Sequence, residues 1–284
     1  MIDLFYEYTE DNLRLQATYF DSNKLDCCVV FVHGQAQSIV DNYFAYILGK
    51  NLSSNGISFL YSHNRGYSYV NCMSRKDGSL EVNGASFEIF EDSLKDIEVW
   101  ITKIKKLGYK KIILMGHSLG CNKALYYLSK NKDSVQGLVL ASATDMVGIT
   151  KKVESDFSDL LKEAENNVNN NNPRKLLNSL IGGTDYISSA TFISEYSENG
   201  NIDNFPIERN PKKFEQLSTI SVPILSFAGE KEYPTYLKQG LLKEKAIKCD
   251  NFEYQIIEDT NHFYVNKEEE VSKILLKWMN KNIK

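Results

Sequence analysis

Residues 111–129 read KIILMGHSLGCNKALYYLS, and this stretch decides the fold. Its first five residues form an apolar run of strand length, and the residues from Cys121 onward have the spacing of a helix. Gly116 and Gly120 stand on either side of Ser118, where the two patterns meet. Because glycine has no side chain to clash, the pair permits a turn tight enough to push the serine outward. The stretch predicts a strand, a sharp turn that exposes Ser118, and a helix.

Apolar runs of strand length alternate with longer helical patterns along most of the chain. This alternation is typical of an α/β protein, in which helices cover both faces of a mostly parallel sheet. Only residues 9–12 separate the first two runs, which favours an antiparallel hairpin at one edge. The eight expected strands lie at 4–8, 13–19, 27–32, 57–61, 111–115, 137–141, 223–228 and 252–257, and the sheet-covering helices at 42–53, 87–107, 121–129, 236–247 and 268–282.

Residues 145–219 interrupt this rhythm, because they contain no clear core strand. Helical patterns at 153–164 and 174–181 flank an asparagine-rich run at 166–172, which we expect to be a mobile connector. A loop-like stretch at 197–211 follows. Insertions of this length between core strands are often functional lids. We therefore expect a core formed by residues 1–144 and 220–284, with a helical cap at 145–219 between the sixth and seventh strands.

The composition excludes several classes of protein. The 284 residues carry 33 basic and 37 acidic side chains, a net charge of −4, and 42% of them are hydrophobic. This balance is ordinary for a soluble globular protein and offers no general positive field for nucleic acid or an anionic membrane. No apolar run approaches the roughly 20 residues that span a bilayer, and the acidic N-terminus is unlike an export signal. We expect a cytoplasmic protein with no nucleic-acid or membrane partner.

The cysteines and glycines indicate neither a metal nor a cofactor. Five cysteines, an odd number without CxxC spacing, suggest reduced thiols rather than a disulfide framework or a zinc site. Neither phosphate-binding pattern, GxxxxGK[ST] or GxGxxG, is present, and no His/Cys cluster has metal-ligand spacing. The chemistry is therefore expected to need no cofactor.

A serine hydroxyl becomes a good nucleophile only when a base removes its proton. Of the four histidines, His33 and His63 follow early strands, and His117 lies within the turn, where its side chain should point away from Ser118. His262 follows the last strand. Loops that follow parallel strands meet at one edge of the sheet, so His262 is the expected base.

That histidine in turn needs a carboxylate to orient it and to stabilise the imidazolium. Glu230 and Glu232 follow the strand at 223–228, and Asp145 follows the strand at 137–141. The residues alone leave these three candidates open.

The chain resembles the α/β-hydrolase superfamily almost from end to end, and the order of serine, acid and histidine is the order of that superfamily. In relatives the acid usually stands three residues after the glycine that ends the seventh strand, which indicates Glu232. Most relatives carry Asp there, so Glu230 and Asp145 remain alternatives. The matching motifs are His33-Gly34, residues 64–68, the turn around Ser118, residues 229–232, and His262.

The resemblance also implies an oxyanion hole. In relatives, one backbone N–H comes from the turn after the third strand, here Gln35 or its neighbour Ala36, and the other from the residue after the nucleophile, here Leu119. Each such donor stabilises a tetrahedral oxyanion by roughly 3 kcal/mol. Arg65 stands in a loop motif of the superfamily, and we expect it to brace that loop.

The resemblance implies a serine hydrolase of the carboxylesterase type that cleaves a small acyl ester through an acyl-enzyme on Ser118, with His262 and Glu232 completing the triad. Thioesterase, amidase and acyltransferase activities would use the same triad. A protein of this fold that binds a small ligand without catalysis is the alternative from another class. The expected partner is a small-molecule acyl substrate, and a homodimer is compatible with the sequence.

Overall fold

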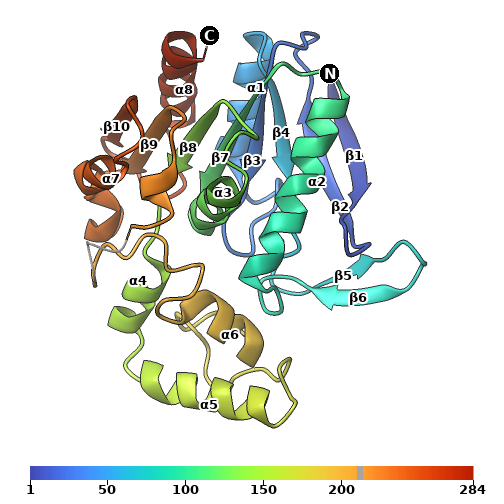
Figure 1. Ribbon diagram of the computed structural model, residues 1–284, viewed down its shortest axis with the longest axis vertical. Coiled ribbons are helices and arrows are strands. Elements are labelled where there is room, and N and C mark those ends of the chain that lie inside the picture. The colour runs from blue at the N-terminus through green and yellow to red at the C-terminus, as the bar shows by residue number, and fades with distance from the viewer. Residues whose placement is uncertain (210–213, 284) are drawn as a thin grey trace.

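An eight-stranded sheet forms the centre of the molecule in the computed structural model, which describes residues 1–209 and 214–283 (Figure 1). The strand order is β1-β2-β4-β3-β7-β8-β9-β10. β2 pairs antiparallel with β1 and β4, and the other neighbours are parallel. All eight predicted strands are present, at β1 (Ile2–Tyr8), β2 (Arg14–Phe20), β3 (Cys27–Val32), β4 (Ser58–Ser62), β7 (Lys111–His117), β8 (Gly137–Ala141), β9 (Ile224–Gly229) and β10 (Phe252–Ile257).

Helices cover both faces of the sheet, as predicted. Every residue of β3 is buried. Side chains of a central parallel strand point alternately to the two faces of the sheet, and helices cover both faces. α1 and α8 pack on one face, while α2, α3 and α7 pack on the other. The five helices are α1 (Tyr43–Ser54), α2 (Ser93–Lys106), α3 (Leu119–Lys130), α7 (Gln239–Lys245) and α8 (Glu268–Asn282).

A second, two-stranded sheet was not predicted from the sequence. β5 (Asn71–Ser74) and β6 (Leu80–Asn83) form an antiparallel hairpin between β4 and α2. Its strands are only four residues long and largely solvent-exposed, so they lack the solid apolar run that marks the central strands. The hairpin extends away from the main sheet in Figure 1.

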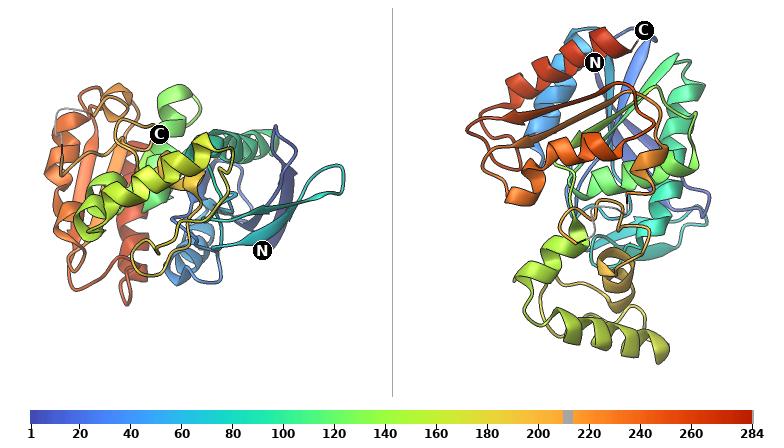
Figure 2. Two further views of the ribbon diagram at one scale, coloured as in Figure 1. Left: turned by 90° about the horizontal axis from the view of Figure 1, so that it is seen from below. Right: turned by 60° about the vertical axis from the view of Figure 1, so that its left-hand side comes forward.

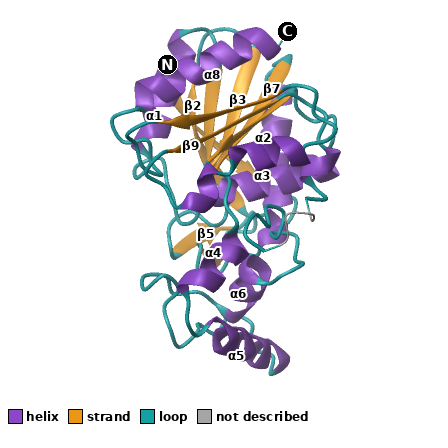
Figure 3. Cartoon of the chain, turned by 90° about the vertical axis from the view of Figure 1, so that its left-hand side faces the viewer, coloured by secondary structure: helices purple, strands orange, loops and turns teal. Residues whose placement is uncertain are grey.

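The insertion between β8 and β9 contains α4 (Met146–Val153), α5 (Phe157–Asn169) and α6 (Ser189–Tyr196). These helices lie beyond one end of the sheet (Figures 2 and 3) and enclose an apolar cluster of their own, which includes Phe157, Phe192 and Tyr196.

Two predictions for the insertion are wrong. The asparagine-rich run is not wholly a connector, because α5 continues through its first four residues and ends at Asn169. Residues 174–181 are not helical: Leu176 and Ile181 instead form isolated bridges with Ser188 and Asp185.

The later part of the insertion returns to the main core. Phe205, Phe214 and Leu217 are buried in the cluster that α2 and α3 form against the sheet. The predicted loop at 197–211 ends outside the described residues.

Candidate active site

Ser118 occupies a strained turn between β7 and α3. Its backbone has φ 55° and ψ −126°, a conformation rare for a residue with a side chain. A Cβ atom at Gly116 would lie 2.3 Å from the carbonyl oxygen of Gly120, and one at Gly120 would lie 2.1 Å from that of Val32. Both positions therefore require glycine. The turn places Ser118 at the N-terminus of a 12-residue helix, where negative charge is stabilised.

His262 and Glu232 meet across the loops that follow β10 and β9. Nδ1 of His262 lies 2.7 Å from Oε2 of Glu232, and the Glu232 side chain is only 1% exposed. β9 and β10 are adjacent parallel strands, with Gly229 paired to Ile257, so the loops that leave their carboxyl ends lie side by side. A carboxylate in this position fixes the tautomer of the histidine and leaves Nε2 available as a base.

The second oxygen of Glu232 is also held. Oε1 accepts hydrogen bonds from the Gly229 N–H at 2.6 Å and from the Ser142 hydroxyl at 2.7 Å. The Tyr264 hydroxyl lies 2.5 Å from that of Ser142 and can donate to it. Burial raises the pKa of Tyr264, so its hydroxyl keeps its proton. The carboxylate therefore has little freedom to turn away from His262.

His117 anchors the loop that carries His262, a role that the sequence did not reveal. The Nε2–H of His117 donates to the backbone carbonyl of His262 at 2.8 Å, and the two rings lie 4.7 Å apart. Burial lowers the pKa of His117, which keeps the ring neutral. Because His117 immediately precedes Ser118, this bond ties the histidine loop to the serine turn.

The other two acid candidates have different partners. Glu230 is exposed and accepts from the backbone N–H of Asp259 at 3.0 Å. Asp145 is buried at the start of α4, where it accepts from the Gly148 N–H at 2.7 Å and pairs with Arg209 at 2.8 Å. The structure thus brings only Glu232 of the three to His262.

The predicted oxyanion donors lie at the ends of β3 and β7. The turn after β3 runs against the serine, since a Cβ atom at Gly34 would lie 3.0 Å from Cβ of Ser118. Leu119 is the first residue of α3. Within the described parts of the chain, the backbone N–H groups of Gln35 and Leu119 have no hydrogen-bond acceptor. Both donors are therefore available to an oxyanion.

The side chain of Gln35 links this turn to the insertion. Its Nε2 donates to the Asp185 carboxylate at 3.2 Å and to the Tyr196 hydroxyl at 3.1 Å. The neighbouring Ala36 has a φ of 54°, which is strained for a residue with a Cβ. The contacts with the insertion thus help to hold a strained turn, and no sequence pattern indicated them.

Arg65 braces its loop, as expected. Its guanidinium is buried and contacts three carboxylates, at 2.8 Å from Asp96, 3.0 Å from Asp92 and 3.1 Å from Asp11. With its charge fully engaged, Arg65 is a structural residue.

The comparisons with known proteins identify the family and the fold. The sequence profile of the alpha/beta hydrolase fold family matches residues 28–265. The chain belongs to this family. Membership of this family supports the assignment of the chain as a hydrolase. No curated protein matches the chain by sequence.

Solved structures share the fold of this α/β hydrolase at low sequence identity. Est1E from Butyrivibrio proteoclasticus with bound ferulic acid has a TM-score of 0.70 at 14% identity and covers 98% of this chain and 99% of its own. The α/β hydrolase GrgF from Penicillium sp. sh18 has a TM-score of 0.72 at 15% identity, covering 100% and 99%. The Pyrococcus furiosus esterase Pf2001 has a TM-score of 0.67 at 15% identity, covering 100% and 92%.

Ser118 opens into a small cavity of about 200 Å³ between the core and the insertion. One wall is apolar and comes mainly from α4, through Met146, Ile149 and Val153. Tyr236 lies edge-on to His262 at 5.2 Å on another side, and burial raises its pKa to about 12. The charged side chains that line the cavity are Glu154 and Asp185, and no lysine or arginine is among the described lining residues.

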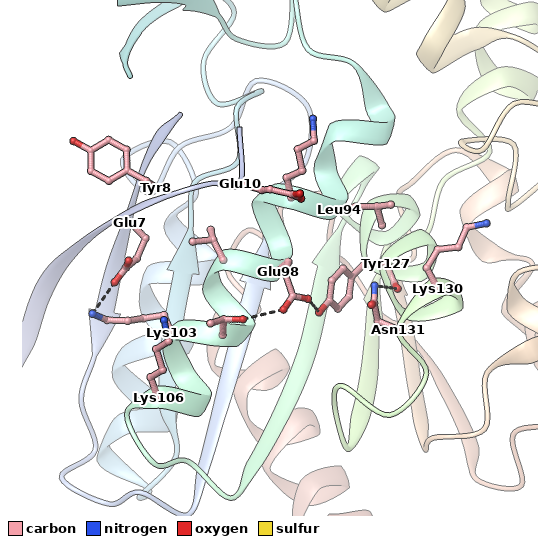
Figure 4. A pocket seen from close by; sticks show the side chains of 13 residues that line it. Glu7, Tyr8, Glu10, Leu94, Glu98, Lys103, Lys106, Tyr127, Lys130 and Asn131 are labelled. Carbon is pink, nitrogen blue, oxygen red and sulfur yellow. Dashed lines mark hydrogen bonds and ion pairs between the residues drawn. The ribbon is translucent and has the colours of Figure 1, made fainter. Parts of the chain in front are cut away.

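The described residues contain no group of three or more side chains suited to hold a metal ion, and no helix among them is long and apolar enough to cross a membrane. A larger cavity of about 720 Å³ lies between β1, α2 and α3 (Figure 4). It contains none of the predicted site residues and is separate from the Ser118 cavity.

Proposed function

We propose that this α/β hydrolase is a serine esterase of the carboxylesterase type, with Ser118 as nucleophile, His262 as base and Glu232 as acid. The observation that carries the proposal is the 2.7 Å pair of His262 and Glu232, tied through His117 to the turn that exposes Ser118. A buried, fully hydrogen-bonded carboxylate behind the histidine is what base catalysis on a serine needs.

In this mechanism, Nε2 of His262 removes the Ser118 proton as Oγ attacks the acyl carbonyl. Glu232 stabilises the imidazolium, and the N–H groups of Gln35 and Leu119 bind the oxyanion. When the tetrahedral intermediate collapses, the ester C–O bond breaks and His262 gives its proton to the departing alcohol. Water, deprotonated by His262, then attacks the acyl-enzyme and releases the acid and free Ser118.

The cavity supports a small substrate. Pockets for drug-sized ligands usually exceed about 300 Å³, and this one holds about 200 Å³. The apolar wall from α4 suits a short acyl chain. Because Glu154 and Asp185 are unopposed by a cation in the described lining, we propose neutral or cationic esters rather than anionic ones.

We also propose that residues 145–219 act as a cap over a core of residues 1–144 and 220–284. The support is that α4 lines the Ser118 cavity and that Asp185 and Tyr196 contact the turn of Gln35. A cytoplasmic location is proposed as well, on the five cysteines, all of which are free thiols.

A fluorophosphonate probe and a series of p-nitrophenyl esters of increasing acyl length test the function. We expect Ser118 to be labelled, short esters to be hydrolysed best, and Ser118→Ala to abolish both, while the matched variant Ser53→Ala on α1 leaves both unchanged. Hydrolysis that survives in Ser118→Ala would exclude the mechanism. An unlabelled Ser118 in a folded protein would favour the non-catalytic binder, and faster cleavage of thioesters or anilides would shift the substrate class.

A further inference from the structure

β1 is an edge strand whose outer side carries unpaired backbone groups. It pairs with β2 without a bulge over all seven residues. The Asp21 N–H donates to the carbonyl of Met1, and the Thr9 N–H donates to that of Leu13, so the odd-numbered residues of this ladder face β2. The N–H and C=O groups of the four even-numbered residues, Ile2, Leu4, Tyr6 and Tyr8, therefore point away from the sheet.

The side chains of the same four residues are exposed and apolar. Leu4 is 64% exposed, Tyr6 51% and Ile2 50%. Soluble proteins usually protect an edge strand with lysine, proline or a bulge, and β1 has none of these. α2 packs against the odd-numbered face of β1, but no described strand pairs with its outer edge, which lies at the margin of the sheet in Figure 1. A regular, seven-residue, apolar edge of this kind is suited to pair with another strand.

We propose that a second copy of this chain pairs antiparallel along β1, about a twofold axis at Phe5, and joins the two sheets. Phe5 is the middle residue of the strand, so this is the register in which all seven residues of both strands are paired. The outward-pointing groups of even-numbered residues then bond to one another. Leu4 lies opposite Tyr6 of the second copy, and Ile2 opposite Tyr8, which are favourable aliphatic–aromatic pairs.

The charges on the other face of the strand fit the same register. Asp3 lies opposite Glu7 of the second copy, a pairing of like charges that would oppose association if it stood alone. Lys103 on α2 offsets one of the two charges: its Nζ lies 2.8 Å from Glu7 (Figure 4) and 5.0 Å from the centre of the Phe5 ring. In this register each Asp3 therefore meets an ion pair of the second copy, Glu7 with Lys103, rather than a bare carboxylate. A shift by two residues would leave one end of each strand unpaired.

The pairing leaves the Ser118 cavity open, since no residue of β1 or β2 lines it. The proposal can therefore be tested independently of hydrolytic activity. Sedimentation velocity over a range of concentrations should give the wild-type protein a mass of twice 32.4 kDa as the concentration rises.

Tyr6→Pro is the decisive variant. It removes an outward N–H without removing a bond to β2, so we expect a protein with the wild-type melting temperature and a mass of 32.4 kDa. Leu4→Lys is a second variant that does not depend on proline. It places a charge on the apolar face and should also give a monomer with the wild-type melting temperature. Leu80→Lys on β6, where the leucine is 67% exposed, is the control and should remain dimeric.

Lys103→Met tests the register, because it leaves Asp3 and Glu7 without their cation and should weaken the dimer at least several-fold. A wild-type protein that stays at 32.4 kDa at every concentration would overturn the proposal. So would folded Tyr6→Pro and Leu4→Lys proteins that dimerise as the wild type does. A Lys103→Met dimer as tight as the wild type would overturn the register.

Discussion

The Glu232 carboxylate lies 2.7 Å from Nδ1 of His262, while Glu230, two residues away in the same loop, points to the backbone of Asp259. Two glutamates in one loop therefore have different surroundings. Glu232 is buried and accepts three hydrogen bonds, from His262, Ser142 and Gly229, whereas Glu230 is exposed. Only a buried carboxylate of this kind can hold an imidazolium at low dielectric.

Glu232→Gln should lower kcat for a short p-nitrophenyl ester by about 10³–10⁴-fold, because the amide no longer stabilises the imidazolium and can hold the wrong tautomer. Glu230→Gln is the matched control and should change kcat by less than about twofold. Asp145→Asn should lower the melting temperature through its lost contacts with Arg209 and α4, with a smaller effect on kcat. A Glu230→Gln protein that loses as much activity as Glu232→Gln would contradict this assignment.

The Tyr196 hydroxyl should contribute to catalysis through Gln35 although it does not touch the substrate's carbonyl in the proposed mechanism. Tyr196→Phe removes one of the two bonds that hold the Gln35 side chain. A lost hydrogen bond of about 1 kcal/mol predicts a decrease of roughly fivefold in kcat with little change in KM. Tyr186→Phe, an exposed tyrosine of the same insertion, is the control. Equal kcat values for the two variants would show that the proposed oxyanion donor at Gln35 does not need this contact.

Removing a carboxylate from the cavity should relax its preference against anionic esters. Glu154→Gln lowers the local negative potential, and a change of about 1 kcal/mol predicts a rise of roughly fivefold in kcat/KM for a p-nitrophenyl hemisuccinate, with little change for the acetate. Glu165→Gln, at an exposed position of α5, is the control: it changes the net charge by the same amount but does not line the cavity. If both variants gain equally, overall charge rather than the cavity determines the selectivity.

Local patterns predicted most of the core. A buried parallel strand such as β3 is a solid apolar run, and the glycines around Ser118 are required by contacts within and beside the turn, so both leave a mark in the sequence. The bond between Glu232 and His262 depends instead on how the loops after β9 and β10 lie in space. Residue physics alone therefore left three acids open, and the family resemblance indicated Glu232.

The insertion was predicted least well, for two physical reasons. Its asparagine-rich run was expected to be a connector from composition, but α5 gains its stability from Phe157, Leu160 and Ala164, which pack into the cluster of the insertion and carry the helix on to Asn169. Phe205 lies within the predicted cap but packs against the main core. A single apolar residue in an irregular stretch does not indicate which of the two cores it joins.

A buried cluster between the insertion and the core also had no sequence signature. Lys123 on α3 and Glu88 before α2 form an ion pair at 2.6 Å with almost no solvent exposure. Glu195 on α6 is buried beside them, and neither of its carboxylate oxygens has a hydrogen-bond donor among the described residues. The ammonium group of Lys123 thus faces two carboxyl groups, those of Glu88 and Glu195, from elements far apart in the chain. Glu88 takes the ion pair, so Glu195 is most stable in its protonated form.

This cluster predicts a loss of stability at rising pH. Burial, and then the negative charges of Glu88 and Glu91, raise the pKa of Glu195 well above its ordinary range, against a smaller opposing effect of Lys123. The folded protein therefore keeps the Glu195 proton to a higher pH than the unfolded chain does. Its contribution to stability is complete below a pH of about 4.3 and is lost as the pH rises through the folded-state pKa.

Glu195→Gln keeps the shape of the protonated side chain but cannot ionise. We expect the melting temperature of the variant to fall less with rising pH than that of the wild type, so that the variant becomes relatively more stable toward alkaline pH. Glu258→Gln, at an exposed site directly after β10, should follow the wild-type curve and is the control. Parallel curves for the wild type and Glu195→Gln across this range would mean that Glu195 carries no extra proton in the folded protein.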